Sequence, residues 1–207
     1  MQLKTILFFL GFLSTCSYSQ IGGKYVYQFL NLAQSPRQAA LGGKTVTVVD
    51  YDVNQAFYNP ATINEKMSNR LSSNFGNYYG EVTYGTASYA YTFDRHVQTF
   101  QAGVNYINYG KFQGTDETGN YTSEFTGSEI ALSAGYSFMI PDIPIHFGTS
   151  AKLISSNLER YNSIGGAIDI GALFIDERND VNWALVVRNI GTQFTSYSGV
   201  NEKLPLE

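Results

Sequence analysis

Few side chains in this sequence are of the kinds that carry chemistry, and they are scattered. The 207 residues include only two histidines, His96 and His146, and one cysteine, Cys16. A metal centre needs a cluster of such ligands, which two isolated histidines do not provide. Asp50 and Asp52 form an Asp-x-Asp pair. Such a pair can bind a cation, but more often it shapes a turn.

Catalytic motifs are also missing. The sequence has no Gly-x-Ser-x-Gly elbow, phosphate loop or zinc motif. We therefore expect no enzyme and no cofactor. The formal net charge of −4 argues against nucleic acid as a partner. Only 14% of residues are charged and 15% are aromatic, which excludes a disordered chain.

The first nineteen residues are typical of a secretory signal peptide. Lys4 supplies the positive charge, an apolar run from Ile6 to Leu13 follows, and Ser17 and Ser19 fit cleavage before Gln20. The alternative is a lipoprotein signal with Cys16 as the acylated residue. Cleavage before Gln20 leaves a mature chain without cysteine, which no disulfide can stabilise.

The region 70–207 reads as strands, because apolar residues recur at every second position. Alternation predicts seven strands, and it is clearest in five of them, near 100–106, 130–140, 145–153, 164–174 and 181–187. The two weaker candidates are 70–79 and 82–93. Most exceed the typical soluble strand of about 5–6 residues and approach the 9–11 of a membrane strand.

The second face of these strands carries mostly Gly, Ala and Ser rather than charges. A soluble sandwich needs a well-solvated outer face, whereas in a membrane barrel the apolar face meets lipid and the small residues face the lumen. Lys152, Asp169 and Arg188 then lie on the lumen face of three consecutive strands, where they can neutralise one another. The rival interpretation is a soluble exported β-sandwich.

The connections favour the same architecture. Those near 94–96, 141–142 and 176–180 are short, and those at 110–127, 155–162 and after Gly191 are longer. Short turns that alternate with longer loops are typical of an outer-membrane barrel.

Seven strands cannot close a barrel, since bacterial single-chain barrels have an even number of strands and an open sheet edge in lipid is costly. We expect an all-β antiparallel transmembrane barrel, of which this chain is the N-terminal part with about seven of about fourteen strands. The expected location is the outer membrane, in contact with its lipid.

Residues 20–69 lack alternation and differ from the strands. Gly42 and Gly43 permit a tight bend, and Pro60 forces Asn59 toward extended geometry. Phe57, Tyr58 and the run from Val46 to Val49 need burial, so we expect a hatch or plug inside the barrel. The alternative is a periplasmic tail.

A series of short motifs in this region, in a fixed order, resembles the PorV/PorQ family. It comprises Ser35-Pro36-Arg37, Leu41-Gly42-Gly43, Asp50, Asp52 and Asn59-Pro60-Ala61. The opening Ile21-Gly22-Gly23-Lys24-Tyr25 looks closer to the PorQ branch. The family consists of outer-membrane barrels of the type IX secretion system in Bacteroidetes, similar in fold to FadL transporters. The resemblance implies that Asn59, Pro60 and Ala61 form a bend in the hatch.

Two functions follow from the resemblance. The first is a non-enzymatic component of type IX secretion that helps anchor a cell-surface attachment complex, with outer loops such as 110–127 and 155–162 docking other secretion proteins. The alternative is a FadL-like transporter of long-chain fatty acids or other hydrophobic molecules, in which the hatch moves. A lipid or hydrophobic ligand in the lumen is compatible with both.

Overall fold

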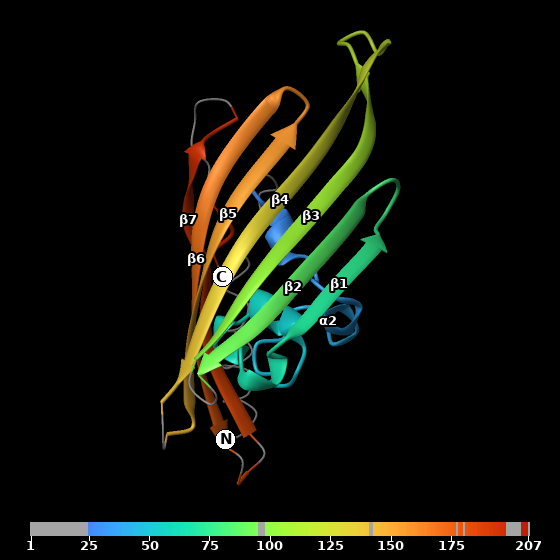
Figure 1. Ribbon diagram of the computed structural model, residues 1–207. Helices are drawn as coiled ribbons and strands as arrows, with labels where there is room; N and C mark the ends of the chain where they lie inside the picture. Colours follow the sequence, from blue (N-terminus) through green and yellow to red (C-terminus); the bar gives the residue numbers. More distant parts are fainter. Residues whose placement is uncertain are drawn as a thin grey trace, which may run out of the picture.

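The computed structural model describes residues 25–94, 98–140, 143–176, 178–179, 181–197 and 204–206. The predicted signal peptide, Cys16 and His96 lie outside these residues. Seven strands form one antiparallel sheet in sequential order (Figure 1). They are β1 (Arg70–Asn77), β2 (Thr83–Asp94), β3 (Gln98–Thr115), β4 (Tyr121–Met139), β5 (Ile145–Leu158), β6 (Tyr161–Asp176) and β7 (Val181–Thr195).

The alternation of apolar and small or polar residues in the sequence gives this sheet two different faces. On β5, Lys152 and Ile154 are buried while Leu153 is exposed, and the same alternation runs through β6. The all-β class and the seven antiparallel strands are therefore confirmed. Among the described residues β1 and β7 do not pair, so the sheet is open. No helix in the described part of the chain is long and apolar enough to cross a membrane.

The predicted long loops at 110–127 and 155–162 are wrong. β3 continues to Thr115 and β4 begins at Tyr121, while β5 and β6 are joined by a turn at 159–160. The many Gly, Asn, Ser and Thr residues of these stretches are typical of loops, but pairs of side chains across the strands allow the sheet to continue through them. The Phe112 and Phe125 rings stack 5.3 Å apart, and Lys111 Nζ lies 3.2 Å from Glu124 Oε2.

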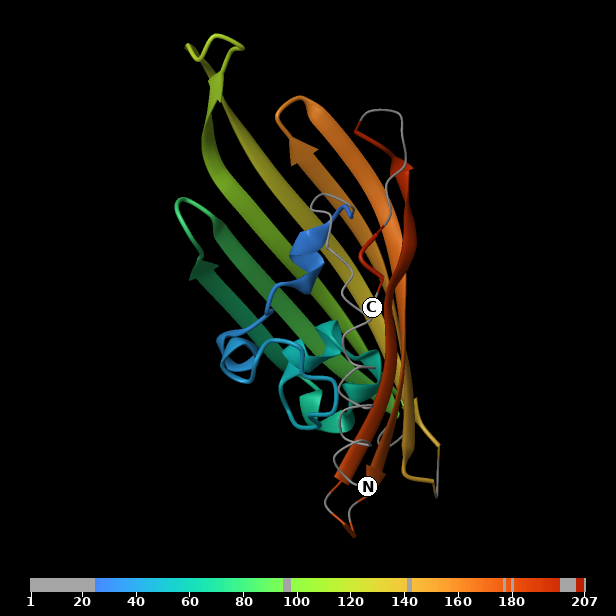
Figure 2. The same ribbon diagram turned by 180° about the vertical axis from the view of Figure 1, so that it is seen from behind.

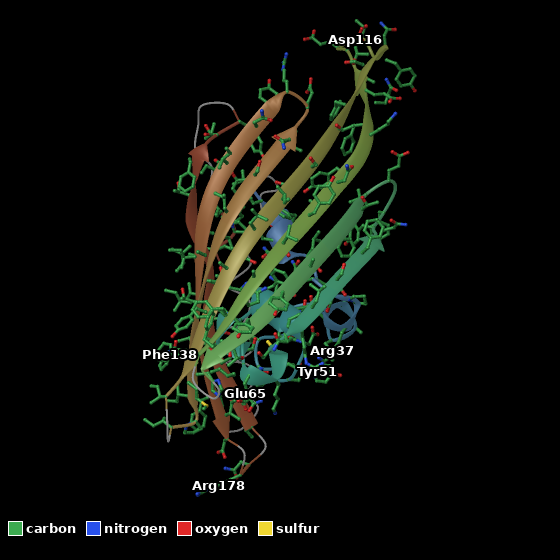
Figure 3. The ribbon with its side chains drawn as sticks, in the orientation of Figure 1. Arg37, Tyr51, Glu65, Asp116, Phe138 and Arg178 are labelled. Carbon is green, nitrogen blue, oxygen red and sulfur yellow. The ribbon has the colours of Figure 1, made fainter. Side chains whose placement is uncertain are left out.

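The β3–β4 hairpin projects past its neighbours. β2 last pairs with β3 at Asn108, and β5 last pairs with β4 at Gly127. Residues 111–126, here called the ribbon, therefore have no strand partner but each other among the described residues, apart from the Glu159 amide that donates to the Thr126 carbonyl at the base. Asp116 marks the tip, at the far end of the molecule from Arg178 (Figure 3). We call this end the ribbon end.

Residues 25–69, here called the N-terminal segment, precede the sheet and contain only short helices. These are η1 (Gln28–Asn31), α2 (Pro36–Ala40), η2 (Val53–Phe57), η3 (Pro60–Thr62) and η4 (Glu65–Met67). The segment lies within the curve of the sheet (Figure 2). It contacts β1 to β3 through η2 and β4 to β6 through η3. We call the sheet face that it contacts the inner face and the opposite one the outer face.

The N-terminal segment supplies much of the buried core. Phe57 and Tyr58 are 3% and 0% exposed, which confirms their predicted burial. The run from Val46 to Val49 is only half-buried. Tyr58 donates its hydroxyl proton to the Leu32 carbonyl, at 2.6 Å, so the one polar atom of this ring is satisfied. Packing against the inner face, rather than regular secondary structure, holds the segment in place.

Candidate functional site

The tripeptide Asn59-Pro60-Ala61 sits on a pair of glycines. Gly148 of β5 and Gly171 of β6 are directly opposite each other in the sheet. A Cβ built on Gly148 would lie under 3.0 Å from the backbone of Pro60 and Ala61, and one on Gly171 would strike the Asn59 side chain. At Gly148 no larger residue fits without moving the backbone of the tripeptide, and at Gly171 the Asn59 side chain would have to shift. We call Gly148 and Gly171 the glycine seat.

The bend itself is fixed locally. Asn59 caps η3 by accepting a hydrogen bond from the Ala61 amide at 2.9 Å, and Pro60 occupies the first helical position. The Asn59 side-chain amide donates to the Val46 carbonyl at 2.7 Å. Asn59 therefore joins two parts of the N-terminal segment while it rests on the sheet. All three residues of the tripeptide are buried.

Gly42 and Gly43 have a different role. Both have positive φ, at 92° and 94°, where residues with a Cβ are strained. The Gly42 amide donates to the Ala39 carbonyl and the Gly43 amide to the Gln38 carbonyl, which is the Schellman pattern that ends α2. No atom lies within 4 Å of a Cβ built on either. They shape a turn and do not contact the sheet.

The two acidic residues of the predicted motif meet Arg37. One guanidinium nitrogen lies 2.5 Å from Asp50 Oδ2 and the other 3.4 Å from Asp52 Oδ2. Each carboxylate also accepts a backbone hydrogen bond: Asp50 from the Asp52 amide and Asp52 from the Asn54 amide. The pair thus shapes a turn and binds an arginine. No cluster of three or more metal-ligating side chains occurs in the described ranges.

Acid is expected to loosen this corner of the N-terminal segment. Partial burial raises the pKa of Asp50, but the hydrogen bond and charge of Arg37 outweigh it and bring the pKa below the ordinary 3.8. Because the folded pKa is lowered, the stabilisation is present above about pH 3.8 and is lost as the pH falls through the folded pKa.

The test of this prediction is urea unfolding at pH 6 and at pH 3 for the wild type and Arg37→Gln. The Arg37 variant should lose less stability on acidification than the wild type, because the pair is already broken. Arg178→Gln, at an exposed turn, is the control and should behave as the wild type. Equal acid losses in the wild type and Arg37→Gln would contradict the prediction.

Lys152 and Asp169 form a buried ion pair on the inner face. Lys152 Nζ lies 2.6 Å from Asp169 Oδ2, and the two side chains are 4% and 0% exposed. Lys152 also donates to Asn189 Oδ1 at 3.0 Å, and the Asn189 amide donates to Asp169 Oδ1 at 2.8 Å. The charges are thus tied to β7 through the backbone and side chain of Asn189.

A β-bulge brings Asn189 into this network. Ile168 pairs with Ile190 and Ile170 with Val187, so Arg188 and Asn189 together face Asp169. Asn189 has a φ of 58°, and both bulge residues are buried. A regular strand would place only one of them on the inner face, because side chains alternate.

Arg188 contacts the N-terminal segment. Its guanidinium donates to the carbonyls of Leu30 and Phe57, at 3.3 and 3.4 Å, and stacks 4.6 Å from the centre of the Tyr58 ring. The predicted group of three is therefore brought to one region, but its members differ in role. Lys152 and Asp169 hold strands together, and Arg188 fastens the segment to the sheet.

Sequence reasoning missed the glycine seat and Asn189. The available signal was that Gly148 and Gly171 each alternate with the apolar residues of their strands, which places both glycines on the inner face. Asn189 follows Arg188 where the apolar alternation breaks. None of these residues forms a catalytic constellation; together they hold the N-terminal segment against the sheet. Comparison with models of known protein families finds no match, and neither does comparison with curated proteins.

Proposed function

We propose that this chain is the N-terminal part of a non-enzymatic outer-membrane β-barrel of the type IX secretion system. The proposed protein is PorQ-like and helps anchor a cell-surface attachment complex. The outer face of the sheet carries the proposal, because it is apolar over strands that also have polar, buried inner faces. The motif resemblance in the N-terminal segment supplies the choice of secretion system.

The outer face supports a lipid environment. Leu132, Leu153, Ile168 and Ile170 are between 49% and 53% exposed although they lie on interior strands of the sheet. An exposed apolar surface of this extent is unfavourable in water and favourable against lipid. β3 to β7 have 14 to 19 residues, more than the about 9–11 that a tilted strand needs to cross a bilayer.

Aromatic rings border the apolar face at the end opposite the ribbon. Five consecutive ring contacts, with centroids 4.8 to 6.2 Å apart, run across four neighbouring strands. They join Tyr91, Phe93, Phe100, Tyr136, Phe138 and Phe147. Phe138 projects from the sheet at this end (Figure 3). Rings at this height suit the interface between acyl chains and water.

The filled inner face favours binding over transport. The tripeptide rests on the glycine seat, Arg188 holds the carbonyls of Leu30 and Phe57, and Tyr27 shares a 2.6 Å hydrogen bond with Ser163. A passage for hydrophobic molecules along this face requires all three contacts to break. Beyond its base, where Lys111 and Thr126 bond to Glu81 and Glu159, the ribbon has no strand partner on either edge among the described residues. It is therefore suited to contact a partner outside the membrane.

A deletion strain tests this proposal. Without the protein, secreted proteins that are normally anchored to the cell surface should appear in the medium, while growth on long-chain fatty acids stays unchanged. A matched strain carrying the intact gene is the control. Lost fatty-acid uptake with normal surface anchoring would instead support the FadL-like transporter. Purified full-length protein that stays monodisperse in buffer without detergent would contradict the membrane barrel itself.

A further inference from the structure

The outward side of β3 and β4 changes from apolar to polar at the base of the ribbon. The last apolar pair on the outer face of these strands is Tyr106 and Ile130, which lie directly opposite each other. The next outward pairs are Asn108 with Ser128, Lys111 with Thr126, and Gln113 with Glu124. Residues directly opposite each other share a face, so this whole side of the ribbon is polar. On the proposed function, the ribbon therefore begins where the lipid ends.

Aromatic rings occupy the other side of the ribbon. Phe112 and Phe125 are directly opposite each other, and their rings stack 5.3 Å apart. Burial alternates along β4 without a break from Ala131 through Glu129 to Phe125, so the rings lie on the continuation of the inner face. Phe112 is 42% exposed. The ribbon is therefore amphipathic in the opposite sense to the sheet, and a two-stranded ribbon gains stability when its apolar side is covered.

Both edges of the ribbon leave backbone groups for a further strand. The Lys111 amide donates to the Glu81 side chain at 3.3 Å, and the Thr126 carbonyl accepts from the Glu159 amide at 2.9 Å. These backbone groups therefore point away from the hydrogen bonds between β3 and β4. Backbone orientation alternates along a strand, so the groups of Gln113 and Glu124, two residues farther from the base, point the same way. Among the described residues neither has a strand partner beyond the ribbon, and such an open edge can accept a strand.

The ribbon carries an excess of negative charge. One lysine stands against three carboxylates, a net charge of −2, and all four side chains are exposed: Lys111, Asp116, Glu117 and Glu124. Hydrogen bonds from Thr118 and Asn120 lower the pKa of Asp116 to about 2, so this group stays ionised at neutral pH. The pair of Lys111 and Glu124 is exposed and weak, which leaves the Glu124 carboxylate able to share a second cation. Because Lys111 belongs to β3, a basic strand is attracted more to the β4 edge.

We propose that the β4 edge of the ribbon binds an extended strand of a partner protein in which basic and apolar residues alternate. The strand pairs with the backbone of Glu124 and places a basic residue beside the Glu124 carboxylate, on the polar side. The apolar residues before and after it project to the other side, where they cover Phe125 and its stacked partner Phe112. This inference rests on the proposed binding function of the ribbon and specifies the class of partner sequence.

The test uses the full chain in phosphatidylcholine nanodiscs and the fluorescein-labelled peptide Thr-Val-Lys-Val-Lys-Val-Thr. Fluorescence anisotropy should rise saturably, and hydrogen exchange of the ribbon amides should slow when the peptide is bound. Empty nanodiscs measure the peptide that binds to lipid alone. A peptide with glutamate in place of both lysines should bind at least about tenfold more weakly, because it brings like charges together. The peptide Thr-Val-Val-Val-Lys-Lys-Thr has the same composition without the alternation and should also bind more weakly.

Two proline variants identify the edge. Glu124→Pro and Gln113→Pro each remove one backbone N–H that points outward, from opposite edges of the ribbon, and proline is tolerated at such positions. The first should abolish binding, and the second should leave it unchanged. Glu124→Gln keeps the N–H and loses only the charge, so it should weaken binding about two- to tenfold. Wild-type exchange protection in β5 and β6 of the peptide-free variants establishes that they are folded.

Three results would overturn the inference: no saturable binding above that of empty nanodiscs, equal binding of the lysine and glutamate peptides, or binding that survives Glu124→Pro and is lost in Gln113→Pro. The last would place the strand on the β3 edge. The secretion function fails separately, through normal surface anchoring in the deletion strain, and that result leaves the peptide measurement unaffected.

Discussion

Gly148→Ala should release the N-terminal segment from the sheet. The added Cβ would lie under 3.0 Å from the backbone of Pro60 and Ala61, which cannot rotate away as a flexible side chain can. Overpacking a tight contact typically costs about 1–3 kcal/mol. We expect that loss in the free energy of unfolding and faster trypsin cleavage at Lys44, an exposed residue of the segment.

Gly171→Ala should act in the same direction, and the double variant should lose more than either single one. Gly85→Ala is the matched control. Gly85 also lies in a strand, but its new Cβ would approach no atom closer than the Asn74 carbonyl oxygen at 3.4 Å. That variant should be as stable as the wild type or slightly more so. Wild-type stability and trypsin resistance in Gly148→Ala would show that the seat does not hold the segment.

Asp169→Ala should destabilise the protein more than any other single change considered for this chain. It leaves the Lys152 ammonium group buried without its carboxylate and removes the acceptor of the Asn189 amide. Breaking one partner of a buried ion pair costs about 3–5 kcal/mol. Equilibrium unfolding in lipid vesicles measures this loss.

The double variant Lys152→Met with Asp169→Leu separates charge burial from packing. Replacing both charges by apolar groups is often close to neutral, so the double variant should be more stable than Asp169→Ala. Lys111→Ala is the control on an exposed pair, since the Lys111 and Glu124 side chains are 67% and 56% exposed. It should cost less than about 1 kcal/mol. An Asp169→Ala loss no larger than that of Lys111→Ala would refute this account.

Alternation in the sequence was sufficient to predict the sheet, because the burial of one face repeats every two residues whatever the neighbouring strand is. It also placed Lys152, Asp169 and Arg188 on one face. The extent of β3 and β4 was not predictable in the same way. The contacts of Lys111 with Glu124 and of Phe112 with Phe125 extend these strands, but they form only when β3 and β4 pair in this register.

The glycine seat could not be predicted from the sequence either. Gly148 and Gly171 are small residues among many on the inner face, and nothing local distinguishes a glycine that receives a tripeptide from one that merely faces inward. The distinction depends on contacts between residues far apart in the chain. Arg37 and its two carboxylates are likewise joined only by the folding of the N-terminal segment.

The bulge at Arg188 and Asn189 changes the parity of β7. Before it the outward apolar residues are odd-numbered, as in Trp183 and Leu185, and after it they are even-numbered, as in Ile190 and Phe194. Deleting Asn189 would leave Arg188 alone opposite Asp169, so the strand would alternate regularly and Ile190 would stay on the outer face. Both halves of β7 would keep their faces, and the loss would be confined to the second inward side chain, with its bonds to Lys152 and Asp169.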